Sequence, residues 1–170
     1  NGGTIFAQTK SQPKWIPNGK SIFVRNGFVT LDIGWVRSVQ SKLRVNDGKW
    51  HEFAVTWRAQ TGKIRFYVDG QAAGGGKMSP KKTLNDQVVR LGFTNEDFPE
   101  NSFFDGEISE LSFYQRLLSD DEIEDSGQRS DEGLVAGWNR QTENQIADAT
   151  GGDLSAELVL GNPQNKIAPG

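Results

Sequence analysis

Cysteine is absent from this 170-residue sequence, and histidine and methionine occur once each. Without cysteine the chain has no disulfide, no thiol nucleophile and no cysteine-ligated metal site. A Ser-His-Asp triad or a histidine-rich metal site would depend on His51 alone. Because His51 lies on a predicted strand beside an apolar series, the sequence favours a structural histidine over a catalytic one.

The sequence also lacks an excess of basic residues and a long apolar run. Nineteen Lys and Arg against 22 Asp and Glu give a net charge of -3, so we expect no nucleic-acid partner. No apolar stretch approaches the roughly 20 residues that a membrane span needs, and residues 1–3 do not resemble a signal peptide. We expect a domain that is appended to others in a larger protein.

Glycine is abundant instead, with 20 residues, and it separates short segments in which apolar and polar residues alternate. Such alternation predicts half-buried strands. The segments are 4–6, 21–25, 28–33, 42–45, 50–57, 63–69, 88–93, 107–114, 134–138 and 154–160. Asn26 and Gly27 accept the positive φ of a tight two-residue turn and predict a hairpin over 21–33.

Few segments of the sequence favour other structure. Ser119 and Glu122 have the spacing of a capping box, which predicts one short helix at 119–123. Residues 71–87, rich in Gly, Lys and Pro, are expected to form a loop. With about ten strands and no βαβ alternation, we expect an all-β fold. We expect this fold to be a two-sheet antiparallel β-sandwich of the jelly-roll kind with at most one short helix.

Two segments resemble the laminin-G-like family of the concanavalin-A-like superfamily. The first is DGKWHEFAVTW at 47–57, followed by GKIRFYVDG at 62–70. The second is FDGEISELSFYQRLLSDDEI at 104–123. The resemblance covers about residues 4–124 and implies a concanavalin-A-like sandwich in a secreted, periplasmic or cell-surface protein.

The strand order departs from that of the family. The pattern that normally opens such domains is found last here, as LVAGWN at 134–139 and DATGGDL at 148–154. We therefore interpret the chain as circularly permuted and 1–170 as a single domain. In this interpretation 134–160 returns to complete the sandwich, and 162–170 is a frayed tail. The alternative is that 134–160 begins a second, truncated repeat.

The resemblance implies a non-catalytic carbohydrate-binding module for a polysaccharide or glycan, held by rim loops and an exposed sheet face. The alternatives are an extracellular protein-interaction or adhesion module and a glycoside hydrolase. A hydrolase on this fold needs two carboxylates on one strand face, as in Glu-x-Asp-x-x-Glu. The sequence has no such string, and Glu107 and Glu110 have the wrong spacing. We therefore expect no enzymatic activity.

The aromatic residues supply the first candidates for sugar binding. Trp15 lies in a Pro-rich loop and Trp35 follows Gly34 at a strand end, so both are candidates for stacking on a sugar, or for covering a sheet edge. Three other tryptophans follow the apolar alternation and are predicted to be core: Trp50, Trp57 and Trp138.

The outward sheet face and one rim loop supply the remaining candidates. On the outward face Arg25, Asp32 and Arg44 are candidates for hydrogen bonds to sugar hydroxyls, or for cross-strand ion pairs. The loop at 94–103 contributes Asn95, Asp97 and Phe98. Calcium is the one candidate cofactor, because oxygen-rich side chains gather in and after this loop. Its candidate ligands are Asn95, Glu96, Asp97 and Asp105.

Overall fold

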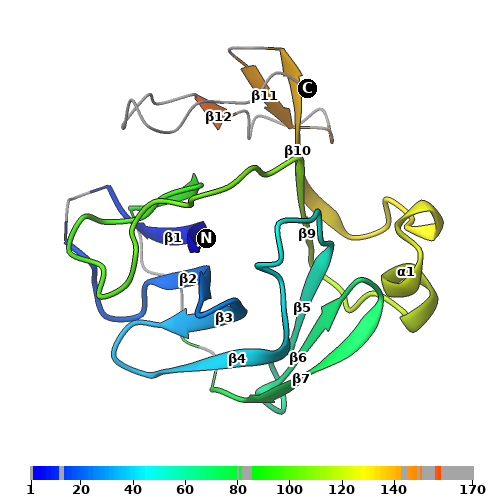
Figure 1. Cartoon of the computed structure of the whole chain (residues 1–170), viewed down its shortest axis with the longest axis horizontal. Helices are drawn as coiled ribbons and strands as arrows, with labels where there is room; N and C mark the ends of the chain where they lie inside the picture. Colours follow the sequence, from blue (N-terminus) through cyan, green and yellow to red (C-terminus); the bar gives the residue numbers. More distant parts are fainter. Residues whose placement is uncertain are drawn as a thin grey trace.

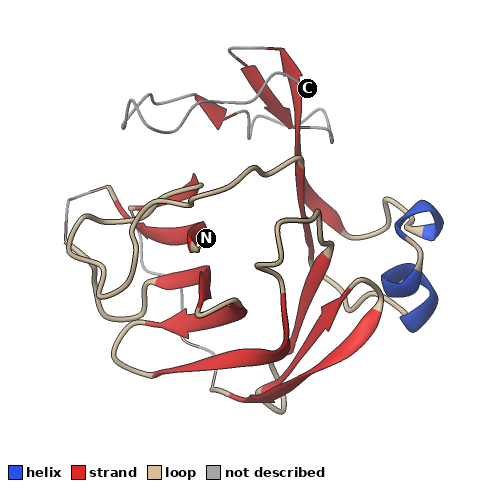
Figure 2. Ribbon diagram, in the orientation of Figure 1, coloured by secondary structure: helices blue, strands red, loops and turns tan. Residues whose placement is uncertain are grey.

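The computed structural model describes residues 2–11, 14–79, 81, 86–142, 145–148, 150 and 156–157. Figure 2 shows that strands dominate and that helix is confined to one segment. The strands are β1 (Gly3–Lys10), β2 (Lys20–Arg25), β3 (Phe28–Ile33), β4 (Arg37–Arg44), β5 (Phe53–Arg58), β6 (Lys63–Val68), β7 (Gln71–Lys77), β8 (Gln87–Leu91), β9 (Glu110–Tyr114), β10 (Leu134–Thr142), β11 (Gln145–Asp148) and β12 (Ala156–Glu157). The helices are α1 (Asp120–Glu124) and a 3-10 turn at Ser126–Gln128. The predicted all-β class is confirmed.

A five-stranded antiparallel sheet runs in the order β4-β3-β2-β1-β8 (Figure 1). The predicted hairpin forms its centre, with β2 and β3 paired from Arg25↔Phe28 to Lys20↔Ile33. The turn between them has φ of 52° at Asn26 and 85° at Gly27. Asn and Gly tolerate this left-handed geometry, which is why the dipeptide predicted the turn correctly.

A second sheet contains β5, β6 and β7 in that order. The predicted loop is wrong over residues 71–77, which form β7. Glycine allows this strand to approach its neighbours closely. A Cβ at Gly76 would lie 2.7 Å from Cγ1 of Val39 on β4, and one at Gly75 would collide with the carbonyl oxygen of Ile64 on β6. The glycines that suggested a loop are therefore packing residues of a strand.

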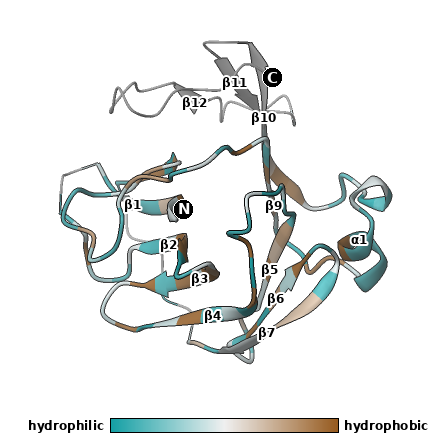
Figure 3. Cartoon of the chain, viewed as in Figure 1, coloured by the Kyte–Doolittle hydropathy of each residue, from teal (hydrophilic) through white to brown (hydrophobic). Residues whose placement is uncertain are grey.

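The main hydrophobic core lies between these two sheets. Val29, Leu31 and Ile33 alternate along β3. They pack in one cluster with residues of β4, β6, β7 and the chain just after β7, namely Val39, Ile64, Phe66, Val68, Ala73 and Met78. Figure 3 shows hydrophobic colour on β3 and β5. The two sheets therefore pack face to face as a sandwich.

The tryptophans predicted to be core differ in their burial. Trp57 packs against the main core and donates from Nε1 to the carbonyl oxygen of Met78 at 3.2 Å. Trp138 on β10 is buried and packs edge-on against Phe113. Trp50 is 63% exposed, so its assignment to the core was wrong. It lies before β5 begins at Phe53, where strand alternation no longer directs side chains inward.

The outer face of the five-stranded sheet is covered by two loops. Phe23 points to this face from β2 and packs edge-on against Phe98 of the β8–β9 connection, with ring centroids 5.2 Å apart. Trp15 of the β1–β2 connection packs against Phe98 in turn, at 4.8 Å. The backbone amide of Trp15 also donates to Oδ1 of Asp97, which ties one loop to the other. Much of the face that the sequence predicted to be exposed is therefore buried.

The helix and the strands that follow it complete the described structure. Ser119 and Glu122 form the predicted capping box of α1. β10 pairs antiparallel with β9, from Leu134↔Tyr114 to Asn139↔Glu110, and the sheet continues through β11 to β12. The predicted strand at 154–160 lies outside the described residues, apart from β12. The predicted tail at 162–170 lies outside them entirely.

Candidate functional site

The turn between β3 and β4 presents Trp35 to solvent. Its side chain is 74% exposed, and its backbone has a φ of 59°, a conformation that costs a bulky residue about 1–3 kcal/mol. The turn is clamped to the preceding loop, because the Gly34 amide donates to Gly19 O at 2.9 Å and the Asn18 amide donates to Gly34 O at 3.0 Å. A side chain at Gly34 would collide with the carbonyl oxygen of Ile16. The backbone under Trp35 is therefore firmly held.

Trp15 lies beneath this turn rather than on the surface. Trp15 is 7% exposed, and its ring contacts that of Phe98. A Cβ added at Gly34 would lie 3.0 Å from Nε1 of Trp15, so the indole lies directly against the turn. The expectation of a stacking surface at Trp15 is wrong in this structure. The alternative that the sequence left open, a covering role, describes it correctly.

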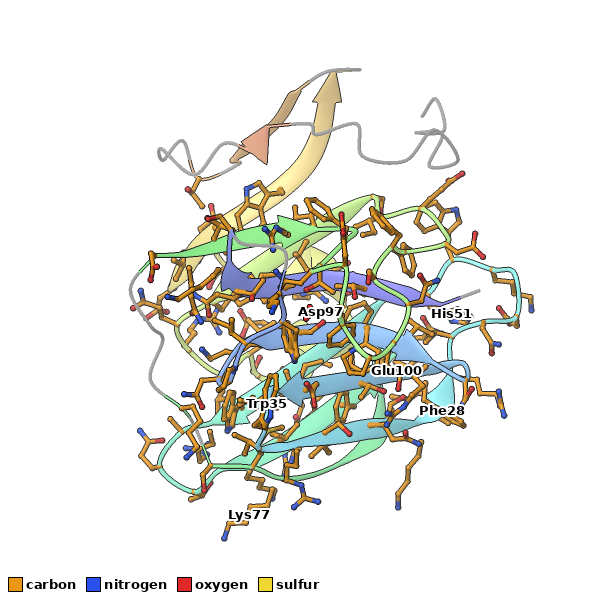
Figure 4. All side chains as sticks on the ribbon, turned by 90° about the vertical axis from the view of Figure 1, so that its left-hand side faces the viewer. Phe28, Trp35, His51, Lys77, Asp97 and Glu100 are labelled. Atoms are coloured by element: carbon orange, nitrogen blue, oxygen red, sulfur yellow. The ribbon has the colours of Figure 1, made fainter. Side chains whose placement is uncertain are left out.

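An open hollow of about 550 Å³ follows Trp35 along the chain. It lies where three segments meet: the start of β4, the β5–β6 turn and the end of β7. Its lining residues are Val36, Arg37, Ala59, Gln60, Thr61, Gly62, Lys77, Met78, Ser79 and Lys81. Figure 4 shows Trp35 and Lys77 toward the same end of the molecule. Sequence reasoning missed this hollow, because its residues come from segments far apart in the chain.

Arg25 and Asp32 come together with Glu100, which the sequence did not single out. Arg25 pairs with Glu100 across 3.1 Å and donates to Ser38 Oγ at 3.4 Å. Burial raises the pKa of the Asp32 carboxyl to about 6; the charge of Arg25 opposes this rise and that of Glu100 adds to it. Each member of the group is partly buried. Arg25 thus forms an ion pair, but with a loop carboxylate and not with a residue of a neighbouring strand.

Arg44 lies opposite Phe28 at the turn end of the β2–β3 hairpin and supports the turn. Its guanidinium stacks over the ring of Phe28, 4.7 Å from the centroid, and donates to Asn26 O at 2.8 Å. These contacts engage the guanidinium of Arg44, which the sequence made a candidate for binding sugar hydroxyls. Arg44 is therefore separate from the surface around Trp35.

The candidate calcium ligands do not form a fitting cage. Oδ1 of Asp97 accepts the Trp15 amide, Asn95 is only 2% exposed, and Glu96 and Asp105 are exposed on separate parts of the loop. Among the described residues no three His, Cys, Asp or Glu side chains gather as metal ligands. The residues present do not fit a calcium ion that needs six to eight oxygens.

His51 lies just before β5, between two carboxylates. Nδ1 is 2.8 Å from Oδ2 of Asp69, and Nε2 is 2.8 Å from Oδ1 of Asp47. The hydrogen bond to Asp69, and then that to Asp47, raises the pKa of the imidazole above its usual 6.5. Asp69 also accepts the amide of Glu52 at 3.0 Å. The imidazole thus joins the loop before β5 to the β6–β7 turn, as expected of a structural histidine.

Comparison with known proteins places these features in a family. Residues 8–124 match the family model described as the concanavalin A-like lectin/glucanases superfamily. The chain belongs to this family. The laminin-G-like resemblance and the β-sandwich expected from it are thereby confirmed.

The chain is also similar to a pentraxin domain-containing protein and to neuronal pentraxins. The chain is 33% identical over 111 residues to mouse sushi, von Willebrand factor type A, EGF and pentraxin domain-containing protein 1, covering 58% of this chain and 3% of that protein. It is 29% identical over 108 residues to rat neuronal pentraxin-1, covering 60% of this chain and 25% of that protein. The chain thus spans a quarter or less of these relatives.

A solved structure shares the fold of this superfamily member. It is that of a candidate carbohydrate-binding protein from Bacteroides ovatus, with a TM-score of 0.57 and 16% identity. The match covers 88% of this chain and 50% of the other. At this identity the likeness establishes the fold.

Proposed function

We propose that this chain binds a polysaccharide or glycan without transforming it, at the end of the sandwich marked by Trp35. The observation that carries the proposal is the exposed indole of Trp35, held on a clamped turn beside a hollow of about 550 Å³. Flat aromatic rings pack against the apolar faces of sugars, and ligand sites combine such a ring with a few polar groups. Gln60, Thr61 and Ser79 supply polar groups in the hollow.

A non-catalytic role is part of the same proposal. The hollow lacks a pair of facing carboxylates among its described residues, and a glycosidase needs such a pair. The carboxyls of Asp32 and Glu100 lie on the loop-covered sheet face, where Arg25 pairs with Glu100. The Bacteroides ovatus protein of the same fold is described as a candidate carbohydrate-binding protein, which supports binding of a carbohydrate.

We propose a location outside the cell or at its surface, in a larger protein. The proposed ligand, a polysaccharide or glycan, supports that location. No helix in the described part of the chain is long and apolar enough to cross a bilayer. The chain matches only a small part of much longer relatives, which supports the presence of other domains in the larger protein.

Replacing Trp35 by alanine tests the site. We expect Trp35→Ala to lower affinity for the bound polysaccharide about tenfold or more, because truncating an aromatic anchor commonly costs ~2 kcal/mol. Stability should change by less than about 0.5 kcal/mol, since the side chain is exposed. Affinity electrophoresis against a panel of plant, algal and microbial polysaccharides finds the ligand and compares the variants.

Trp50→Ala is the matched control for that experiment. Trp50 is also highly exposed, yet it precedes His51, which Figure 4 shows well away from Trp35. We expect Trp50→Ala to bind as the unmodified chain does. Equal losses in both variants would refute the placement of the site, and a panel without any bound polysaccharide would refute the function.

A protein-interaction module is the second candidate. Val88 and Val89 are both exposed on β8, which lies at the edge of the five-stranded sheet, and edge strands with apolar side chains can pair with another chain. The mouse relative is a multidomain protein by its name, which favours a protein-interaction module. A partner whose binding is lost in Val89→Lys and kept in Trp35→Ala would establish it.

A further inference from the structure

A row of cations crosses the end of the three-stranded sheet, next to the hollow. Arg58 on β5 is directly opposite Lys63 on β6, and Lys63 is directly opposite Lys77 on β7. Directly opposite residues point to the same face with their Cβ atoms about 5 Å apart, and like charges in such pairs repel each other. This repulsion lowers the stability of the unliganded protein.

More cations lie within the hollow itself. Arg37, Lys77 and Lys81 line it, and Nη1 of Arg37 donates to Lys77 O at 3.2 Å, which fixes the guanidinium at the edge of the sheet. None of the described residues that line the hollow is acidic. Within the described ranges, no ion pair includes a cation of the hollow or of the row.

This local excess contrasts with the charge of the whole chain. The net charge is -3, so the chain has enough carboxylates to neutralise these five cations, yet no ion pair among the described residues uses one for them. Other cations of the protein do have partners: Arg25 pairs with Glu100, Arg116 with Glu122 and Arg129 with Glu52. A surface that keeps repelling charges together beside a hollow is complementary to an anion.

We propose that the hollow beside Trp35 binds the acidic groups of an anionic polysaccharide, either uronic acid carboxylates or sulfate esters. This inference rests on the proposed carbohydrate function and specifies its ligand. Trp35 contacts a sugar face, while Arg37, Lys77 and Lys81 contact the acidic substituents. Guanidinium and ammonium groups form strong, charge-assisted hydrogen bonds with both kinds of anion. The acidity of the whole chain and the exposed indole favour a carbohydrate over a nucleic acid.

Affinity electrophoresis with four probes tests the ligand class at low salt. Polygalacturonate carries carboxylates, dextran sulfate carries sulfate esters, dextran is neutral, and a single-stranded DNA oligonucleotide is a polyanion without acidic sugars. We expect binding to polygalacturonate or dextran sulfate, with the better probe identifying the acidic group, and weaker binding to the other two. Binding should weaken as salt rises, because exposed charges are screened.

A matched pair of charge variants tests the position. Lys77→Gln and Lys49→Gln each remove one exposed positive charge, the second from the loop that precedes His51. We expect Lys77→Gln to lower affinity about two- to fivefold, because the loss of one exposed ion pair typically has an effect of this size. Lys49→Gln should have little effect. The double variant Lys63→Gln with Lys77→Gln should bind still more weakly and melt no lower, because it relieves the repulsion.

The outcomes separate this inference from the function on which it rests. Equal losses in Lys77→Gln and Lys49→Gln would overturn the site, since bulk charge would then suffice. DNA binding as tight as that of the acidic polysaccharides would overturn the carbohydrate assignment. Binding of neutral polysaccharides alone, lost in Trp35→Ala, would overturn the acidic ligand and leave the proposed function standing. Failure of every polysaccharide would refute both.

Discussion

His51 is held by two carboxylates, and its protonation should affect stability. The pKa of the imidazole is raised by Asp69 and Asp47, so folding is favoured when the ring is protonated. This contribution is fully present below the unfolded pKa of about 6.5 and is lost as pH rises through the higher pKa of the folded state. We expect the difference in melting temperature between the unmodified chain and His51→Gln to shrink from pH 6 to pH 9.

A proton NMR titration provides the direct check. Because the sequence contains one histidine, its imidazole signals need no assignment. A midpoint at or below 6.5 would contradict the bridge between Asp47 and Asp69. Asp32 also has a raised pKa, but its contribution is common to both proteins and cancels in the comparison.

The tryptophans show what single residues reveal in the sequence. Alternation placed Trp138 correctly in a buried position and Trp57 in a partly buried one against the main core, because both lie on strands with an apolar face. It failed for Trp50, three residues before its strand begins. For Trp15, which the sequence places in a loop, no local pattern shows that a loop from a distant part of the sequence covers it. Trp35 was a stacking candidate because it follows Gly34 at a strand end, and it is exposed in the structure. Burial in loops depends on tertiary contacts that the sequence pattern does not contain.

Among the elements, those set by local chemistry were predicted best. The Asn26-Gly27 turn and the capping box at Ser119 depend on residues within four positions of each other. The strand β7 was missed, and β4 begins at Arg37 rather than at residue 42, because their pairing depends on partners elsewhere in the chain. The hollow was missed for the same reason, because its lining comes from three separate segments of the chain.

The close packing of β7 can be tested by filling its glycine. We expect Gly76→Ala to destabilise the protein by about 1–3 kcal/mol, because the added Cβ would lie 2.7 Å from a methyl of Val39. Gln71→Ala, on the same strand but exposed, should change stability by less than about 0.5 kcal/mol. Urea unfolding measures both. Equal stability of the two variants would show that β4 and β7 do not pack closely at this point.

At the scale of the whole molecule, the interpretation of 134–160 as the closing part of this sandwich stays a proposal. β10 pairs antiparallel with β9, and Trp138 packs against Phe113, which also packs against Phe6 of β1. We expect a chain that ends at Gly133 to aggregate or unfold, because removal of Trp138 and β10 exposes the ring of Phe113 and leaves the edge of β9 unpaired.

A chain that ends at residue 161 is the control for this truncation. It should remain monomeric with an unchanged melting temperature, as measured by size-exclusion chromatography and thermal melting. A chain ending at Gly133 that is equally monomeric and stable would instead favour the alternative, in which 134–160 begins a second repeat.

The clamped turn under Trp35 has a consequence for how fast a ligand is captured. Its backbone is already fixed by Gly19 and Asn18, so only the two torsions of the indole side chain remain to be restricted when a sugar arrives. Little conformational searching is then needed after collision. Encounter frequency, assisted by long-range attraction to the nearby cations, should therefore govern how quickly the complex forms.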